Sequence, residues 1–175
     1  MRAFGGADVP LNTVEDRQFF RLWFAEPLHA LQGLPNGQGG FVALATSCFL
    51  YERYATAVLQ RQGEKANRAG ILRQLQADFS VDQATAAAFW AVIRNGILHQ
   101  GMPLQRGQGK SLPSWEFRRD YPLMALEMIA GHTLLKVQPW KFMDRVLELW
   151  EANLDLLRAS GSFPWATIVP VPPRP

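Results

Sequence analysis

The longest run of helical periodicity in the chain extends from Gly40 to Gln62. Apolar and small side chains recur there every three or four residues and form one stripe, made of Phe41, Leu44, Cys48, Tyr51, Ala55, Val58 and Leu59. This spacing predicts an amphipathic helix of about six turns. A helix of this kind is stable only when other elements cover its apolar stripe, so it favours a packed, mainly helical domain.

The flanking segments predict the elements that cover it. We expect a helix ending near Leu31 and kinked at Pro27, and a helix through Ile71 to Phe79. The sequence Ser80-Val-Asp-Gln83 resembles a capping box and predicts the start of a further helix that carries Arg94. Residues 115–138 lack helical spacing and predict a hairpin that turns at Gly131-His132. A last helix is expected from Pro139 to Gly161.

Length and composition indicate one domain. The chain has 175 residues, 48% of them hydrophobic, which is enough for a genuine core. We expect a mainly α fold of four to five helices with a small β-hairpin insertion before the last helix. The predicted domain covers residues 12–160, with the hairpin at 115–138. Residues 1–11 are a loose lead-in, and residues 161–175 form a proline-rich C-terminal tail.

The charge and the cysteine content bear on partners and compartment. Residues 53–119 carry ten Lys and Arg against four Asp and Glu, whereas the rest of the chain carries eight against eleven. A basic segment suits an anionic ligand, and equally a solvated helical face. The single cysteine, Cys48, favours a reducing compartment, and we expect a buried, inert thiol. The longest uncharged apolar run, residues 41–51, is too short to span a bilayer. A cytoplasmic protein without a membrane partner is expected.

One short stretch gathers side chains suited to phosphate chemistry. Arg94, Asn95 and His99 lie within six positions at the end of an apolar helical segment. A fixed cation, an amide and an imidazole can hold a phosphate and move a proton beside it. The structural alternative is that Arg94 caps the helix end and His99 packs against a neighbouring element.

Other chemistries lack their motifs. The three histidines show no metal-ligand spacing, so no metal and no cofactor are expected. Gly109-Lys110-Ser111 is not a phosphate-binding P-loop, because Leu104 occupies the position of the first required glycine.

The sequence Arg94-Asn-Gly-Ile-Leu-His99 resembles the Arg-x4-6-His signature of HEPN domains, in which asparagine commonly follows the arginine. The motif covers six residues, and the resemblance extends loosely over residues 12–160. It implies an antiparallel helical bundle that forms a homodimer, so that two motif copies share one cleft. Active members are metal-independent RNA endonucleases, some of which act as toxins or defence effectors with a neutralising partner protein.

The resemblance also implies roles for individual residues. His99 would assist proton transfer from the ribose 2′-hydroxyl or hold the phosphate, Arg94 would stabilise the phosphoryl oxygens, and Asn95 would orient a partner or the phosphate. Beside it, the residues themselves suggest supporting groups. Glu52 lies next to the stripe of the long helix, where it could orient a basic site residue or form a surface ion pair. Four basic residues could contact RNA phosphates: Arg106, Lys110, Arg118 and Arg119.

Two questions remain open at this point. On a regular helix, residues five positions apart differ by about 140° in direction, so Arg94 and His99 would not face one cleft. Either Gly96 loosens the last turn, or the two residues meet across a dimer axis. The leading alternative function is a non-catalytic helical module that dimerises or docks a partner. A bundle that binds a small molecule is a weaker third option.

Overall fold

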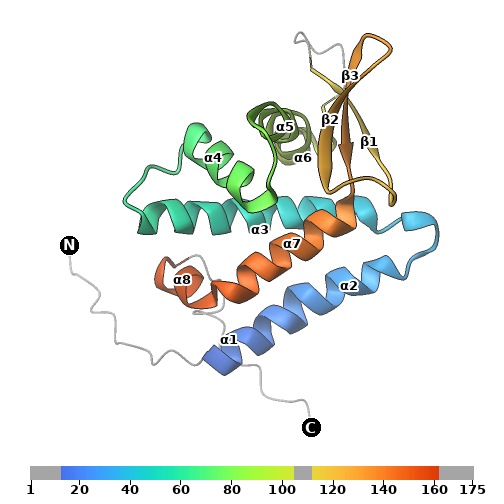
Figure 1. Ribbon diagram of the computed structural model, residues 1–175. Coiled ribbons are helices and arrows are strands. Elements are labelled where there is room, and N and C mark those ends of the chain that lie inside the picture. Colours follow the sequence, from blue (N-terminus) through green and yellow to red (C-terminus); the bar gives the residue numbers. More distant parts are fainter. Residues whose placement is uncertain (1–12, 105–111, 162–175) are drawn as a thin grey trace.

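The computed structural model describes residues 13–104 and 112–161 (Figure 1). These residues form a mainly helical structure with a small three-stranded sheet between α6 and α7. The lead-in, the tail from residue 162 and the predicted RNA contacts Arg106 and Lys110 lie outside the described residues.

The predicted long helix is confirmed as α3 (Gly40–Arg61), which runs through the middle of the structure (Figure 1). Before it, the chain forms α1 (Thr13–Phe20), the π-helical turn η1 (Arg21–Ala25) and α2 (Glu26–Gln32). The sequence predicted a kink at Pro27. In the structure Pro27 lies in the first turn of α2, and the change in helix type comes just before it, in η1. A short 3-10 turn, η2 (Pro35–Gly37), leads into α3. Gly39 permits this tight return, because a Cβ there would lie 2.5 Å from the Leu31 carbonyl oxygen.

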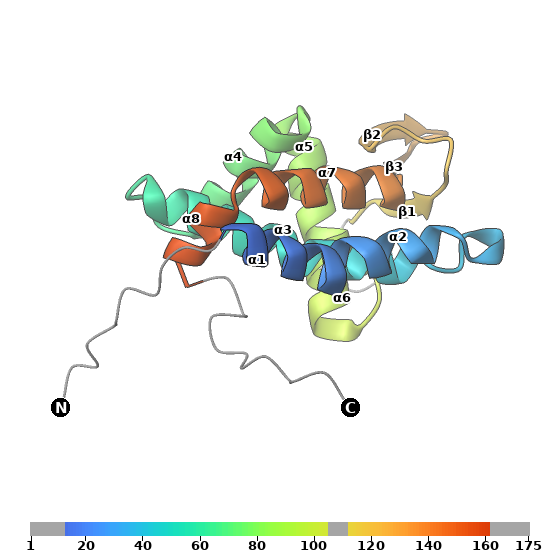
Figure 2. The same cartoon turned by 90° about the horizontal axis from the view of Figure 1, so that it is seen from below.

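On the other side of α3 lie α4 (Arg68–Phe79) and a helix made of three segments, α5 (Gln83–Phe89), η3 (Trp90–Arg94) and α6 (Asn95–Gln100). This second helix is seen nearly end-on in Figure 1 and lengthwise in Figure 2, so it crosses α3 rather than lying along it. The cap predicted at Ser80 is wrong. Asp82 caps α5 by accepting a 2.7 Å hydrogen bond from the Thr85 amide, while Ser80 is left-handed and ends α4.

The sheet corrects the prediction of a plain hairpin. Strands β2 (Met124–Ile129) and β3 (His132–Val137) are antiparallel, and β1 (Ser114–Phe117) adds to β3 in parallel, giving the order β1-β3-β2. The turn is one residue earlier than expected, because Ala130 and Gly131 have positive φ angles and His132 begins β3. Short primed turns of this kind match the twist of paired strands.

The predicted last helix is two helices, α7 (Pro139–Ala152) and α8 (Leu154–Ala159). Asn153 interrupts it with non-helical backbone angles, and its side-chain amide donates to the Leu149 carbonyl at 2.8 Å. Local side-chain bonds to the backbone compete with helix continuation in this way.

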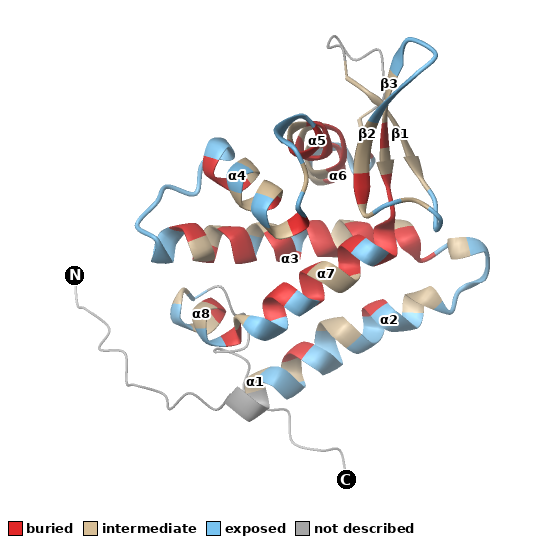
Figure 3. Ribbon diagram, viewed as in Figure 1, coloured by how far each residue is buried: buried red, intermediate tan, exposed pale blue. Residues whose placement is uncertain are grey.

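The core lies between α3, α7 and the helices around them, where the burial colouring is concentrated (Figure 3). The Trp150 indole is fully buried, stacks on Phe20 and donates to the Leu50 carbonyl at 2.8 Å. A second cluster of aromatic side chains joins α3, α4, α5 and α7. It consists of Tyr51, Phe79, Phe89 and Phe142. Both clusters fix α3, and with it the surface that meets Arg94.

Candidate functional site

Arg94 lies where a π-helical turn passes into α6. In η3 the backbone hydrogen bonds reach five residues back, so the Asn95 amide donates to the Trp90 carbonyl. Such turns widen a helix locally and shift the direction of the side chains that follow. Trp90, Val92 and Ile93 are buried, which anchors the turn against the core. The helix ends at Gly101, whose φ of 71° is the left-handed conformation typical of a helix end.

Three neighbours hold the Arg94 guanidinium in one orientation. Glu52 on α3 accepts from Nε at 3.1 Å and also from Nη2, forming a two-point ion pair. The Asn95 side-chain oxygen accepts from Nη1 at 2.9 Å, and the Trp90 ring lies 4.7 Å from the guanidinium carbon. The side chains of Arg94 and Glu52 are only 15% and 29% exposed. The structure therefore brings together Arg94, Asn95 and Glu52.

This arrangement leaves part of the guanidinium unused. Arginine has five N–H donors, and the contacts to described residues occupy one on Nε, one on Nη1 and one on Nη2. One donor therefore remains on each terminal nitrogen. Guanidinium N–H groups are strong donors to phosphoryl oxygens. Arg94 thus does not cap the helix, which was the structural alternative.

His99 lies in the last turn of α6 and is exposed. Among the described residues its side chain has no hydrogen-bond or ion-pair partner, so it is not packed against a neighbouring element. Arg94 ends η3, and His99 lies five residues later in the α-helical α6. On α-helical geometry this spacing corresponds to about 140° around the helix axis, which does not favour a meeting of the two side chains within one copy.

Gly96 does not loosen α6, contrary to one of the two expectations. Instead it is buried where the chain returns after the helix, and a Cβ there would lie 2.5 Å from the Leu104 nitrogen and 2.6 Å from the Met102 oxygen. The Leu104 amide donates to the Val92 carbonyl at 2.9 Å. The glycine thus permits residues 102–104 to pass directly against the helix that carries Arg94.

The surface beside the Arg94–Glu52 pair is partly apolar. Phe49, Glu52, Arg53 and Thr56 line an open hollow of about 400 Å³ on α3. Phe49 is 51% exposed, as is Val42, seven residues earlier on the same face. Beneath this surface, burial raises the pKa of the Cys48 thiol well above its usual range. Cys48 is therefore a buried, unreactive thiol, as expected.

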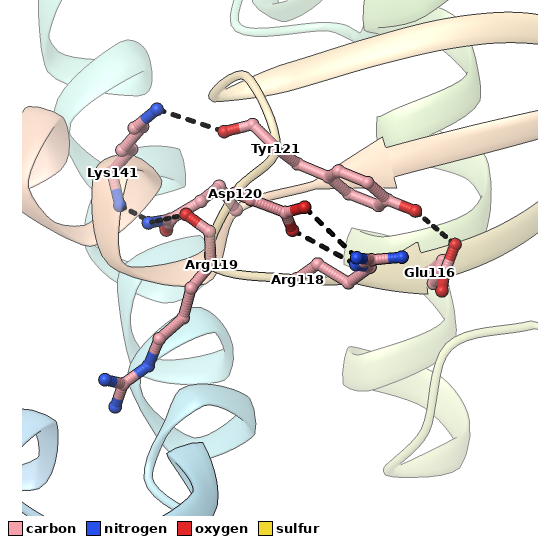
Figure 4. Close-up of polar contacts among 7 residues, drawn as sticks. Glu116, Arg118, Arg119, Asp120, Tyr121 and Lys141 are labelled. Carbon is pink, nitrogen blue, oxygen red and sulfur yellow. Dashed lines mark hydrogen bonds and ion pairs between the residues drawn. The ribbon is translucent and has the colours of Figure 1, made fainter.

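The two basic residues in the β1–β2 connection differ in what they contact (Figure 4). Arg118 forms a two-point ion pair with Asp120, at 3.0 and 3.1 Å, and lies over the Tyr121 ring. Arg119 has no carboxylate partner among the described residues, and its Nη2 is 3.4 Å from the Gln32 carbonyl oxygen. In Figure 4 the Arg119 side chain points away from the Arg118–Asp120 pair.

Two further observations limit the chemistry and topology of the described residues. Among them, no group of three or more His, Cys, Asp or Glu side chains is placed to hold a metal ion. No helix within residues 13–104 and 112–161 has the length and hydropathy that a bilayer crossing requires.

Comparison with known proteins adds no assignment. The chain matches no family model, and no curated protein or solved structure is significantly similar to it. The HEPN resemblance therefore rests on the motif from Arg94 to His99 and on the mainly helical surroundings. Sequence reasoning selected Glu52 as a supporting residue but missed Trp90, whose spacing of four before Arg94 could have identified it as a stacking partner.

Proposed function

We propose that this chain is a metal-independent RNA endonuclease of the HEPN type. The observation that carries the proposal is the fixed Arg94 guanidinium. Its contacts with the described residues leave two donors unused, and it lies one helical segment before an exposed histidine. Phosphoryl transfer depends mainly on positioning and on donors aimed at the developing charge. A preorganised arginine and an exposed imidazole meet those needs without a metal ion.

In the proposed reaction, the ribose 2′-hydroxyl oxygen attacks the adjacent phosphorus. His99 accepts the hydroxyl proton, and the two remaining N–H groups of Arg94 bind the non-bridging oxygens as negative charge accumulates. The bond to the 5′-oxygen of the next nucleotide breaks, and that oxygen takes up a proton from water, while His99 returns its proton to the solvent. The products are a 2′,3′-cyclic phosphate and a 5′-hydroxyl. DNA lacks the 2′-hydroxyl and would not react.

Asn95 and Glu52 serve as positioning residues in this proposal. Both accept hydrogen bonds from Arg94, so they select one side-chain orientation before the substrate arrives. Fixing a long side chain in advance removes an entropic cost from the reaction step. Asn95 thus orients Arg94, which binds the phosphate, and does not bind the phosphate itself.

The proposed active species is a homodimer. Because the spacing of Arg94 and His99 does not favour their meeting within one copy, Arg94 of one copy would meet His99 of the other. The half-exposed Val42 and Phe49 beside Glu52 offer an apolar surface for this contact. The antiparallel bundle, a cytoplasmic location, and a role as a toxin or defence effector with a neutralising partner belong to the same proposal.

The test is RNA cleavage by purified protein in EDTA, followed by analysis of the product ends. We expect cyclic phosphate termini, no DNA cleavage, and a loss of at least about 100-fold in rate for His99→Ala. His29→Ala is the matched control, because His29 is an exposed histidine of α2 paired with Asp144. Cleavage by His99→Ala at the wild-type rate would remove the site assignment.

A second candidate function is a non-catalytic module. The Glu52 carboxylate neutralises Arg94, so the ion pair can serve only to hold α3 against the helix formed by α5, η3 and α6. The exposed Val42 and Phe49 would then bind a partner protein. This reading predicts no cleavage by the wild-type protein under any ionic condition.

A further inference from the structure

A second concave site lies between the α2–α3 connection and the sheet, on the side of the structure away from α8 (Figure 1). Residues 32–41 form one wall, and residues 117–119 with the start of α7 form the other. The cavity has a volume of about 720 Å³ and opens to solvent. Pockets of this size accommodate small organic ligands.

The charged part of this lining is basic. Arg118 and Arg119 contribute two positive charges, and no lining residue is acidic. Asp120 already neutralises Arg118. Arg119 carries its charge without a carboxylate partner among the described residues, and its Nε lies 3.9 Å from where a Gly37 Cβ would stand. The uncompensated charge in the cavity is therefore the Arg119 guanidinium, which suits an anionic group.

Part of the remaining lining is apolar and aromatic, and the amides of Gln32, Asn36 and Gln38 supply its neutral polar groups. Phe41, Phe117 and Trp140 line the cavity together with Pro139. Aromatic side chains in a concave site stack on planar rings, and they do so with little dependence on ring identity. The lining thus combines a cation for an anionic group with flat apolar surfaces for a ring.

The backbone beneath Arg119 is held from several directions. The buried Gln138 side chain donates to the Arg119 carbonyl at 3.4 Å and accepts from the Lys141 amide at 2.8 Å. Lys141 in turn donates to the Tyr121 carbonyl at 3.0 Å (Figure 4). These bonds join the β1–β2 connection to the first turn of α7, so the position from which Arg119 extends is fixed.

We propose that this cavity binds a nucleotide, with its phosphate on Arg119 and its base against the partly exposed rings of Phe41 and Phe117. The nucleotide is either a free mononucleotide or one unit of a single-stranded RNA, because both present the same phosphate and ring. The inference does not depend on the nuclease proposal, since it uses none of the residues around Arg94.

The test is a titration of the protein with small ligands. Binding is measured by calorimetry, and the site is located by changes in amide NMR shifts. The probes are AMP, adenosine, inorganic phosphate and a hexauridylate RNA. We expect AMP to bind more tightly than adenosine or phosphate alone, with shifts concentrated at residues 33–41 and 117–119. Arg119→Gln should weaken AMP binding by about tenfold, the loss of one charge-assisted contact. Arg119→Lys should restore part of it.

Arg73→Gln is the matched control, because Arg73 is an exposed arginine of α4 paired with Glu64 outside the cavity. It should leave AMP binding unchanged. Hexauridylate that competes with AMP, binds more tightly and depends on Arg119 would identify RNA as the source. AMP binding without hexauridylate binding would identify a free nucleotide.

Failure of both AMP and hexauridylate to bind at millimolar concentration would overturn the proposal. Equal AMP affinity for Arg119→Gln and the wild type would overturn it as well. Inorganic phosphate binding as tightly as AMP would remove the nucleotide assignment, because the two aromatic rings would then contribute nothing. The NMR shifts of the wild-type protein locate the site even if a variant folds poorly.

Discussion

Glu52 on α3 and Arg94 at the end of η3 are joined by two hydrogen bonds between carboxylate and guanidinium, across 42 positions of sequence. The contact links the longest helix to the helix that crosses it. It also determines which guanidinium donors remain for a ligand. One ion pair therefore supports both the local packing and the proposed chemistry.

Replacing Glu52 by glutamine should destabilise the fold. The amide offers only one acceptor oxygen, and its NH2 group would face a guanidinium donor. We expect a loss of about 2 kcal/mol in the free energy of unfolding, because a largely buried charge loses its partner. Urea denaturation measures it. Glu64→Gln, at an exposed pair with Arg73, is the control and should cost less than about 1 kcal/mol. Equal losses in both variants would contradict the account.

Gly96→Ala should disturb the segment that returns past α6. The added methyl would lie within 2.7 Å of three backbone atoms of residues 102–104, so the backbone itself must move. We expect destabilisation of about 2 kcal/mol or more, measured by thermal unfolding. Gly33→Ala is the matched control, because its nearest contact would be 3.4 Å away. A stability of Gly96→Ala equal to that of the control would show that the close approach is absent.

Stability should depend on pH through Asp78. Partial burial raises the pKa of this carboxyl, while bonds from Gln74 and Tyr51 lower it less. With a folded pKa above the unfolded one, the folded state gains stability at low pH and loses it as pH rises through the folded pKa. Relative to Asp78→Asn, the wild type should therefore lose stability from about pH 4 upward. Urea denaturation of both proteins from pH 4 to 7 checks this, and a constant difference would contradict it.

The proposed dimer should depend on the exposed face of α3. Replacing both Val42 and Phe49 by serine removes apolar surface that is half-exposed in one copy, so folding should be little affected. Sedimentation should show a dimer for the wild type and a monomer for the double variant. Met128→Ser, on the 71% exposed tip of β2, is the control and should remain dimeric. A double variant that stays dimeric would place the interface elsewhere.

The helices were predictable where apolar periodicity is strong. The stripe from Phe41 to Leu59 identified α3 nearly to the residue, and Pro139 marked the start of α7. Features set by packing or by distant pairing were not predictable. The strand β1 has only four residues and exists through its parallel pairing with β3. The π-helical turns η1 and η3 also interrupt segments whose spacing predicts ordinary α-helix.

Other differences between the predicted and the observed structure arise where the local sequence fits more than one conformation. Ser80 and Asp82 are both good capping residues two positions apart, and the choice depends on how α4 ends. The candidate site was predictable as a set of residue types, including Glu52, but not as a geometry. The cavity around Arg119 could not be foreseen, because it unites two connections more than 80 residues apart, as the Arg119–Gln32 contact shows.

The central claim is that Arg94 of one copy and His99 of another act on one phosphodiester. The most direct measurement is RNA cleavage in EDTA by Arg94→Ala, by His99→Ala, and by an equimolar mixture refolded together, with each variant's folding checked by circular dichroism. We expect each variant alone to be inactive and the mixture to regain a measurable share of wild-type cleavage, because mixed dimers contain one intact pair. A mixture as inactive as its components, beside an active wild type, would contradict the shared site, and an inactive wild type would contradict the nuclease itself.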